Sequence, residues 1–263
     1  MESILERVVE HGELKVLKSL NIDEFKAVVF DLDSTLMDTH RYPLVASEWL
    51  MKHSNVDVDK HGESYVRNLV SRYFKAIEET ISGAPFVTPF EIIRTAMGKS
   101  LEDHGYEADA TLVEQATQRF RSLHVELSEP YPGVPELLAK LENHGLDLGI
   151  LTNSFEGNAD IILGNWNLRH HFKAIIDCGT AKAFKPMPQL FEITLSLLGV
   201  TPSETLFIGD EYYADMVGGK RASLTTVWIN HRGNSLEDLI VKYGPEYSPD
   251  YVTKSISEFA DML

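Results

Sequence analysis

The sequence predicts an α/β protein with a doubly wound, mostly parallel sheet and an inserted, wholly helical segment. Two observations support this prediction. Short apolar runs that end in polar residues alternate with helical stretches, around residue 30 and again from residue 134 onward. Such alternation is typical of parallel sheets with right-handed crossovers. Between these parts, residues 36–129 show helical periodicity and no strand-like run.

Composition fits a folded enzyme. The chain has 263 residues, enough for one large domain or two modest ones, with 43% hydrophobic and 24% charged residues. Its net charge of −16 argues against nucleic acid or an anionic membrane as a partner. The single cysteine, Cys178, is expected to be a small core residue in a reducing compartment. With no signal-like N-terminus and no apolar run of membrane length, we expect a cytoplasmic protein.

The first segment, residues 1–22, has apolar residues at helical spacing with a break near Gly12. This pattern predicts a helical arm that covers the core. A dimerisation arm is the alternative, and both a monomer and a homodimer are compatible with the sequence.

Residues 26–37 then predict a strand that delivers two acids to a site. Val28, Val29 and Phe30 form a short run of the kind found in strands buried on both faces. Asp31 and Asp33 follow at a spacing of two, so in an extended chain they point to the same side. Because two converging carboxylates repel one another and lose solvation, we expect a cation beside them.

The next segment, residues 39–129, predicts an insertion of roughly four helices. Helices are expected near residues 45–53, 66–81 and 112–127, the last with Asp109 as its cap, and a fourth begins at Thr88. Thr88, Pro89 and Glu91 match a capping box with proline at the first helical position. Aromatic and methionine residues of these helices are expected in the core of the insertion rather than in a substrate pocket.

Residues 23–38 and 130–263 are predicted to form the sheet domain. Residues 130–133 indicate a linker. Strands are expected at 146–151, 174–178, 205–208 and 226–229, with helices at 135–144, 158–165 and 188–198 between them. Ligands of such sheets bind beyond the carboxyl ends of the strands. This rule places Asp31, Thr152 and Asp210 on one rim.

Four short motifs on this rim resemble those of the haloacid dehalogenase superfamily. They are Asp31-Leu-Asp33-Ser-Thr35, Thr152-Asn153, Lys185-Pro186 and Gly209-Asp210 followed by Asp215. The resemblance covers residue 24 to the C-terminus. It implies a Rossmann-like core, identifies the helical insertion as a C1-type cap, and places the chain in the phosphatase branch of the superfamily. Two positions depart from the family pattern, since Ser34 stands where glycine is commonest and Glu211 adds a carboxylate after Asp210.

The chemistry of the motifs predicts phosphoryl transfer. Asp31 is the candidate nucleophile, and Asp33 is expected to protonate the leaving oxygen and then to take a proton from water. Mg²⁺ would be held by Asp31, Asp33 and Asp210; the resemblance implies that residue 33 binds it through its main-chain carbonyl.

The remaining motif residues are expected to bind phosphate or to orient the nucleophile. Thr152, backbone amides near Asn153, and Lys185 would contact the phosphate. Asp215 would orient Lys185 or a metal-bound water. Thr39, His40 and Arg41 lie close enough in sequence to line the entrance, where Arg41 either meets a second anionic group or stays solvated. The histidines show no metal-ligand spacing.

We therefore expect a magnesium-dependent phosphatase that acts on a small phosphorylated metabolite. Asp33 argues against a 2-haloacid dehalogenase, because expulsion of halide needs no proton. A phosphomutase or another phosphotransferase of the superfamily would share every core residue. A non-catalytic binding or regulatory protein is the alternative from a different class, and the intact set of groups argues against it.

Overall fold

The structure is a computed structural model that describes residues 20–263. The helical arm expected at residues 1–22 therefore lies almost entirely outside the described residues. The described part begins with a short 3-10 turn at Ile22–Glu24, whose isoleucine packs into the core.

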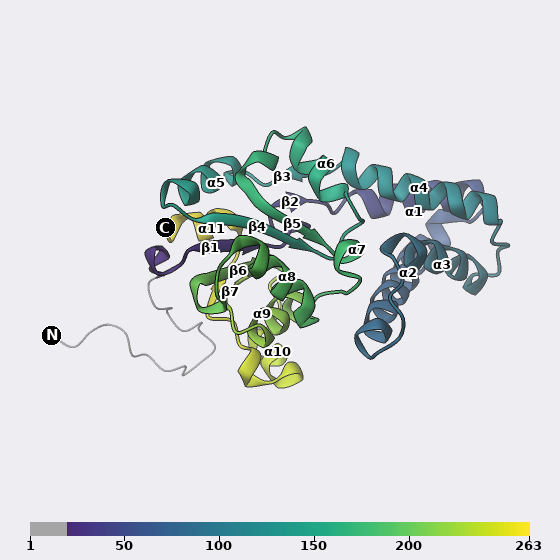
Figure 1. Ribbon diagram of the computed structural model, residues 1–263. Helices are drawn as coiled ribbons and strands as arrows, with labels where there is room; N and C mark the ends of the chain where they lie inside the picture. Colours follow the sequence, from purple (N-terminus) through teal and green to yellow (C-terminus); the bar gives the residue numbers. More distant parts are fainter. Residues whose placement is uncertain (1–19) are drawn as a thin grey trace.

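A parallel sheet forms the centre of the larger lobe (Figure 1). Within the described residues it has six strands in the order β5-β4-β1-β6-β7-β8, and every neighbouring pair is parallel. The strands are β1 (Ala27–Phe30), β4 (Asp147–Thr152), β5 (Phe172–Asp177), β6 (Thr205–Gly209), β7 (Thr225–Ile229) and β8 (Tyr251–Thr253). Strand order reverses at β1, which lies between β4 and β6, so the carboxyl end of β1 is the switch point where such sheets bind ligands.

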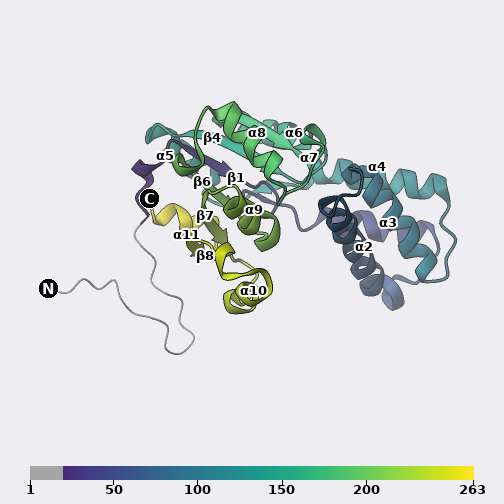
Figure 2. The ribbon, with the colours of Figure 1, turned by 60° about the horizontal axis from the view of Figure 1, so that its bottom comes forward.

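Helices cover both faces of this sheet, as Figures 1 and 2 show. Val28 and Phe30 of β1 pack on one face against α5 (Val134–Asn143), α6 (Asn158–Asn165) and α11 (Ile256–Asp261). Val29 faces the opposite way, toward α8 (Pro188–Leu198). This alternation explains the continuous apolar run, because each side chain has a covered face to enter. The same lobe contains α7 (Cys178–Ala181), α9 (Gly218–Arg221), α10 (Leu236–Tyr243), 3-10 turns at Arg169–His171, Pro202–Glu204 and Pro245–Tyr247, and a π-helical turn at Tyr212–Val217.

The inserted helices form a second lobe beside the sheet, which we call the cap (Figures 1 and 2). The cap consists of α1 (Tyr42–His53), α2 (Val58–Ile81), α3 (Pro89–Asp103) and α4 (Ala110–Glu126) and has its own apolar core. Two expected helix starts are confirmed. Thr88 and Glu91 form the capping box of α3, and the Asp109 side chain accepts a hydrogen bond from the amide of Leu112 at 2.8 Å.

Two short strands join the cap to the sheet domain. β2 (Met37–Asp38) pairs antiparallel with β3 (Glu129–Pro130), so the chain enters and leaves the cap along adjacent paths. The sequence predicted no strand here, because a strand of two residues has no periodicity to detect. Asp33 is bridged to Met37 of this ribbon, so the connection to the cap begins beside the predicted site.

The expected α/β fold with an inserted helical cap is confirmed, with small shifts of boundaries. β5 begins at Phe172 and ends at Asp177, earlier than predicted, and β8, α10 and α11 were not predicted. Cys178 is fully buried and opens α7, which confirms it as a core residue. In the described part of the chain, no helix is long and apolar enough to cross a membrane.

Candidate active site

The carboxyl end of β1 presents Asp31 to the site. The Asp31 amide still donates to the carbonyl of Ile208 at 2.8 Å, so the chain stays extended to this residue. Ser34 then turns the chain with a φ of 63°, in the left-handed region. That conformation favours glycine, which accounts for the glycine expected at this position.

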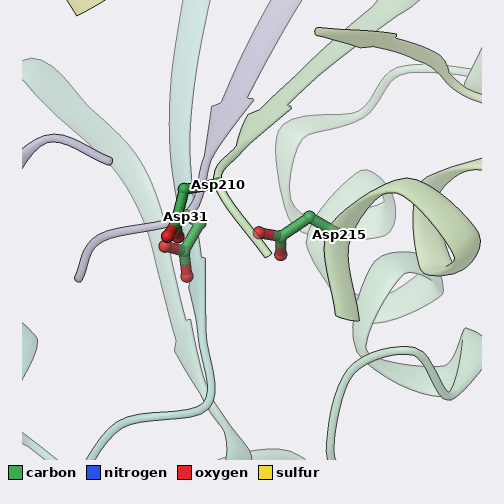
Figure 3. A group of neighbouring side chains, drawn as sticks. All are labelled: Asp31, Asp210 and Asp215. Carbon is green, nitrogen blue, oxygen red and sulfur yellow. The ribbon is translucent and has the colours of Figure 1, made fainter. Parts of the chain in front are cut away.

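Three buried carboxylates converge at this end of the sheet (Figure 3). Asp31 and Asp210 follow β1 and β6, and Asp215 reaches toward them from the π-helical turn; each offers an oxygen within 4.8 Å of the others. A Cβ atom on Gly209 would lie 2.3 Å from Asp215 Oδ2, so this close approach requires glycine.

Electrostatics show that this cluster fits a hard divalent cation. Burial raises the pKa of Asp31 well above its ordinary value, and burial also raises the pKa of Asp215, while the neighbouring carboxylates push in the same direction. Such groups ionise together only if positive charge offsets their desolvation and repulsion. Clustered carboxylate oxygens are the ligands that Mg²⁺ and similar ions prefer.

Lys185 supplies one positive charge. Its Nζ donates to Asp31 Oδ1 at 2.5 Å and to Asp215 Oδ1 at 2.8 Å, and the side chain is only 2% exposed. Burial disfavours its charge, but Asp215 and Asp31 outweigh that effect and raise the pKa of Lys185. Lys185 is therefore a fixed cation beside the candidate nucleophile, and Asp215 orients it.

The strand β4 carries two further predicted residues to the same rim. Thr152 lines the site, and its Oγ1 accepts from the amide of Ser154 at 3.1 Å. The Asn153 side chain accepts from the amide of Lys185 at 2.8 Å and donates to its carbonyl at 3.2 Å. The Asn153 side chain thus holds the Lys185 backbone in place, so a contact of Asn153 with phosphate would come from its main-chain amide.

Asp33 stands apart from the cluster of three carboxylates. Its Oδ1 lies 2.7 Å from Nε2 of His124, a fully buried residue of the cap helix α4. Burial pushes the pKa of Asp33 upward, but the charge and hydrogen bond of His124 outweigh burial and lower it. Asp33 is therefore poised as an ionised acceptor, and its side chain is not among the oxygens that converge on the cation site.

The hydrogen-bond partner of Nδ1, the other ring nitrogen, shows which nitrogen of His124 bears the hydrogen. Asn158 Nδ2 lies 3.0 Å from His124 Nδ1 and also donates to the carbonyl of Arg121 at 3.1 Å. Because that carbonyl can only accept, the amide NH₂ group faces His124, and Nδ1 accepts from it. His124 consequently bears hydrogen on Nε2 and donates it to Asp33.

Arg232 and His231 lie beside Asp210. Arg232 Nη2 is 2.9 Å and His231 Nε2 is 3.2 Å from Asp210 Oδ2. Arg232 also approaches Glu211 at 3.3 Å. Glu211 thus points to an arginine, although burial raises its pKa.

A cavity of about 430 Å³ connects these groups to the cap. Thr39 and His40 line it as expected, whereas Arg41 is exposed and does not. On the cap side it is lined by α2 residues, including Tyr73 and Phe74. The expectation that the cap aromatics serve only as core was wrong, because the apolar stripe of α2 is wider than its contact with the other helices.

Two residues of the candidate site, His124 and Arg232, were missed in the sequence, and each had a weak signal. His124 follows Phe120 by four residues, which places a polar side chain on the buried stripe of its helix. Arg232 comes shortly after the predicted strand at 226–229, on the same rim as Asp210. Neither signal shows which carboxylate the side chain contacts, because that contact depends on how distant segments pack together in the fold.

Comparisons with known proteins find relatives that match most of this chain. The HAD-hydrolase YfnB of Bacillus subtilis is 27% identical over 91% of this chain and 95% of its own length. Its magnesium-bound crystal structure superposes with a TM-score of 0.74 over 91% of this chain and 98% of YfnB. N-acetylmuramic acid 6-phosphate phosphatase of Pseudomonas aeruginosa is 29% identical over 86% of this chain and 91% of that enzyme. Pyrophosphatase PpaX of Bacillus mycoides is 27% identical over 91% of this chain and 97% of its own length.

A family model for haloacid dehalogenase-like hydrolases matches residues 25–223, from just before β1 to just after α9. This match covers the greater part of the chain and every motif residue discussed above. The expected superfamily and the hydrolase class are therefore confirmed: the chain belongs to the family of haloacid dehalogenase-like hydrolases.

Proposed function

We propose that the protein is a Mg²⁺-dependent phosphomonoester hydrolase that acts on a small phosphorylated metabolite through an aspartyl-phosphate. The observation that carries this proposal is the position of Lys185, buried between Asp31 and Asp215 at the switch point of the sheet. Similarity to the pyrophosphatase and to the N-acetylmuramic acid 6-phosphate phosphatase supports the class of reaction.

In the first step a carboxylate oxygen of Asp31 attacks phosphorus, and the bond between phosphorus and the ester oxygen breaks. Lys185 holds Asp31 in position and offsets the charge of the transferred group. Thr152 and backbone amides near Asn153 would bind the phosphoryl oxygens. The departing alcohol takes a proton from Asp33, which takes up that proton from solvent when the approach of the anionic phosphate raises its pKa.

In the second step water attacks the phosphorus of the aspartyl-phosphate, and the bond to Asp31 breaks. Asp33 takes the proton of this water, a role that suits the ionised form that His124 maintains. Inorganic phosphate then leaves, and Asp31 is restored.

The proposed role of the cation site is to supply positive charge next to the phosphate. Bound Mg²⁺ would supply a hard positive centre that lets an anionic nucleophile meet an anionic phosphate. Asp31, Asp210 and the main-chain carbonyl of residue 33 are the ligands we propose, and Asp215 lies close enough to share the site. The magnesium-bound structure of YfnB supports the choice of metal.

Asp33 separates this proposal from its alternatives within the family. A dehalogenase expels halide and has no use for a proton donor at this position. A phosphomutase would use the same residues with a sugar hydroxyl in place of water as acceptor, and release of free phosphate distinguishes the two. The single cysteine, which is buried, supports the proposed cytoplasmic location.

We also propose that residues 39–129 move as a unit on a core made of residues 23–38 and 130–263. The antiparallel β2 and β3 would act as the hinge, since both connections lie side by side there. The crystal structure of YfnB is described as revealing interdomain movement, which supports this division.

The test is release of phosphate from acetyl phosphate with and without Mg²⁺. We expect release that depends on the metal, stops with a chelator and is abolished in Asp31→Asn. Asp59→Asn, an exposed residue of α2, is the matched control and should retain activity. Metal-independent release that persists in Asp31→Asn would falsify the proposal.

A further inference from the structure

The cavity has two chemically different halves. The half formed by the sheet domain carries carboxylates, Thr152 and Lys185. The half formed by the cap is apolar and is built mainly by Val66, Leu69, Val70, Phe74, Ile77 and Ile93. Among the described residues of α1 to α4, the only polar groups on this wall are the hydroxyls of Tyr42 and Tyr73, and that of Tyr73 donates to the carbonyl of Asn153 at 3.4 Å.

The cations that line the cavity already have acidic partners. Lys185 pairs with Asp31 and Asp215, and Arg232 pairs with Asp210 and Glu211. His40 lies at the rim and contacts Asp38. A substrate with a second phosphate, a carboxylate or a row of hydroxyls would therefore lose hydration at the cap wall, where among the described residues α1 to α4 offer it only the hydroxyls of Tyr42 and Tyr73.

The apolar wall is also partly open to water. Val70 is 43% and Phe74 is 47% exposed, although both line the cavity beside the reacting groups. Burial of these side chains by a ligand would be favourable in proportion to the apolar area covered. A cavity of about 430 Å³ has room for more than a phosphate group, so with phosphate at the sheet end the rest of a substrate would lie against the apolar half.

We propose that the leaving group of the substrate is apolar, an aryl or medium-chain alkyl alcohol, which the α2 face of the cap selects. This inference rests on the proposed phosphatase function. The phosphate binds at the sheet end, and the hydrocarbon lies along α2. The chemistry disfavours polyol phosphates, diphosphates and phosphorylated carboxylic acids.

The first experiment measures kcat/KM for a series of n-alkyl phosphates from ethyl to octyl, whose leaving groups differ little in basicity. Each methylene buried against the cap should raise kcat/KM by up to about fourfold until the cavity is filled. Propyl phosphate should exceed glycerol 1-phosphate, its hydroxylated counterpart, by at least about tenfold. A flat series, or a preference for the hydroxylated ester, would overturn the inference.

The second experiment tests whether α2 provides the selectivity. Val70→Gln and Phe74→Gln should each lower the ratio of octyl to ethyl phosphate turnover by about tenfold or more. Val87→Gln is the matched control, because Val87 is a cap residue of similar exposure, 39%, that does not line this cavity. An unchanged ratio in both α2 variants contradicts the assignment of this wall.

Acetyl phosphate separates failure of the inference from failure of the proposed function. If neither acetyl phosphate nor any ester releases phosphate in a manner that depends on Asp31, the proposed function fails and the inference falls with it. If acetyl phosphate is hydrolysed but hydroxylated or doubly charged esters are preferred, the phosphatase proposal stands and only the apolar leaving group is refuted.

Discussion

His124 of the cap and Asp33 of the sheet domain form a hydrogen bond of 2.7 Å between Nε2 and Oδ1. Neighbours hold the histidine in place: Asn158 donates to its Nδ1 at 3.0 Å, and Ser154 Oγ lies 3.3 Å from the same atom. Asp33, the proposed general acid and base, is thus positioned by a residue of the cap. Correct proton transfer would therefore depend on how the cap docks on the sheet domain.

Replacement of His124 should impair proton transfer more than binding. General acid catalysis is worth on the order of 10²–10⁴ in rate, and a misplaced Asp33 loses part of it. His124→Phe should therefore lower kcat for an alkyl phosphate by about tenfold or more. It should have a smaller effect with p-nitrophenyl phosphate, whose leaving group needs little protonation. The readout is kcat measured separately from KM for each ester.

His124→Gln is the companion variant, because its amide can still donate toward Asp33 and should recover part of the activity. Equal losses with both esters, without recovery in the glutamine variant, would instead indicate that His124 serves only to stabilise the fold.

Removal of the Lys185 charge should damage both activity and stability. Lys185→Met leaves the buried carboxylates Asp31 and Asp215 without their shared partner, which typically costs about 3–5 kcal/mol of unfolding free energy. Turnover should fall to background. Urea unfolding and phosphate release measure the two effects. Lys182→Met is the control: Lys182 lies three residues earlier and is exposed, so neither quantity should change much.

Stabilisation by Mg²⁺ should weaken as the pH falls. The pKa of Asp31 in the folded, metal-free protein is raised by burial, so the folded state binds a proton more readily than the unfolded chain. The resulting stability is present at low pH and is lost as the pH rises through the raised folded pKa. Mg²⁺ competes with that proton, so it should raise Tm more at pH 7.5 than at pH 5. Thermal unfolding of wild type and Asp210→Asn, with and without Mg²⁺ at each pH, measures the rise in Tm. An equal rise in both proteins would mean that the ion binds elsewhere.

Ser34→Gly should stabilise the protein. Ser34 has a φ of 63°, a conformation that costs a residue with a side chain roughly 1–2 kcal/mol and costs glycine little. The greater freedom of glycine in the unfolded chain offsets part of the gain, which leaves about 0.5–1 kcal/mol. Chemical denaturation gives this value. Ser82→Gly serves as the comparison, because Ser82 has a φ of −82° and should show no such gain.

The sheet and the position of Asp31 at its rim could be predicted from the sequence because their signals are local. A short apolar run predicts β1, and its abrupt end in Asp31 marks the rim. The capping box at Thr88 and the cap at Asp109 likewise depend on residues within one turn of helix. Each of these features involves neighbours in the sequence, so the structure reproduces it.

The remaining parts of the site depend on contacts between distant segments. His124 meets Asp33 across 91 positions of sequence, and Lys185 meets Asp31 across 154. Family resemblance supplied the second contact, but the first follows only from how α4 docks on the sheet domain. The short β2 and β3 were missed for a related reason, because each strand is defined by its partner and not by its own sequence.

The most direct test of the proposed mechanism is the chemical identity of the intermediate. The protein is mixed with a phosphate ester and Mg²⁺, quenched in acid within one turnover, and digested for mass spectrometry. We expect one phosphoryl group on Asp31 that hydroxylamine removes, and none in Asp31→Asn. A phosphoryl group on another residue, or full turnover in Asp31→Asn, would contradict this mechanism.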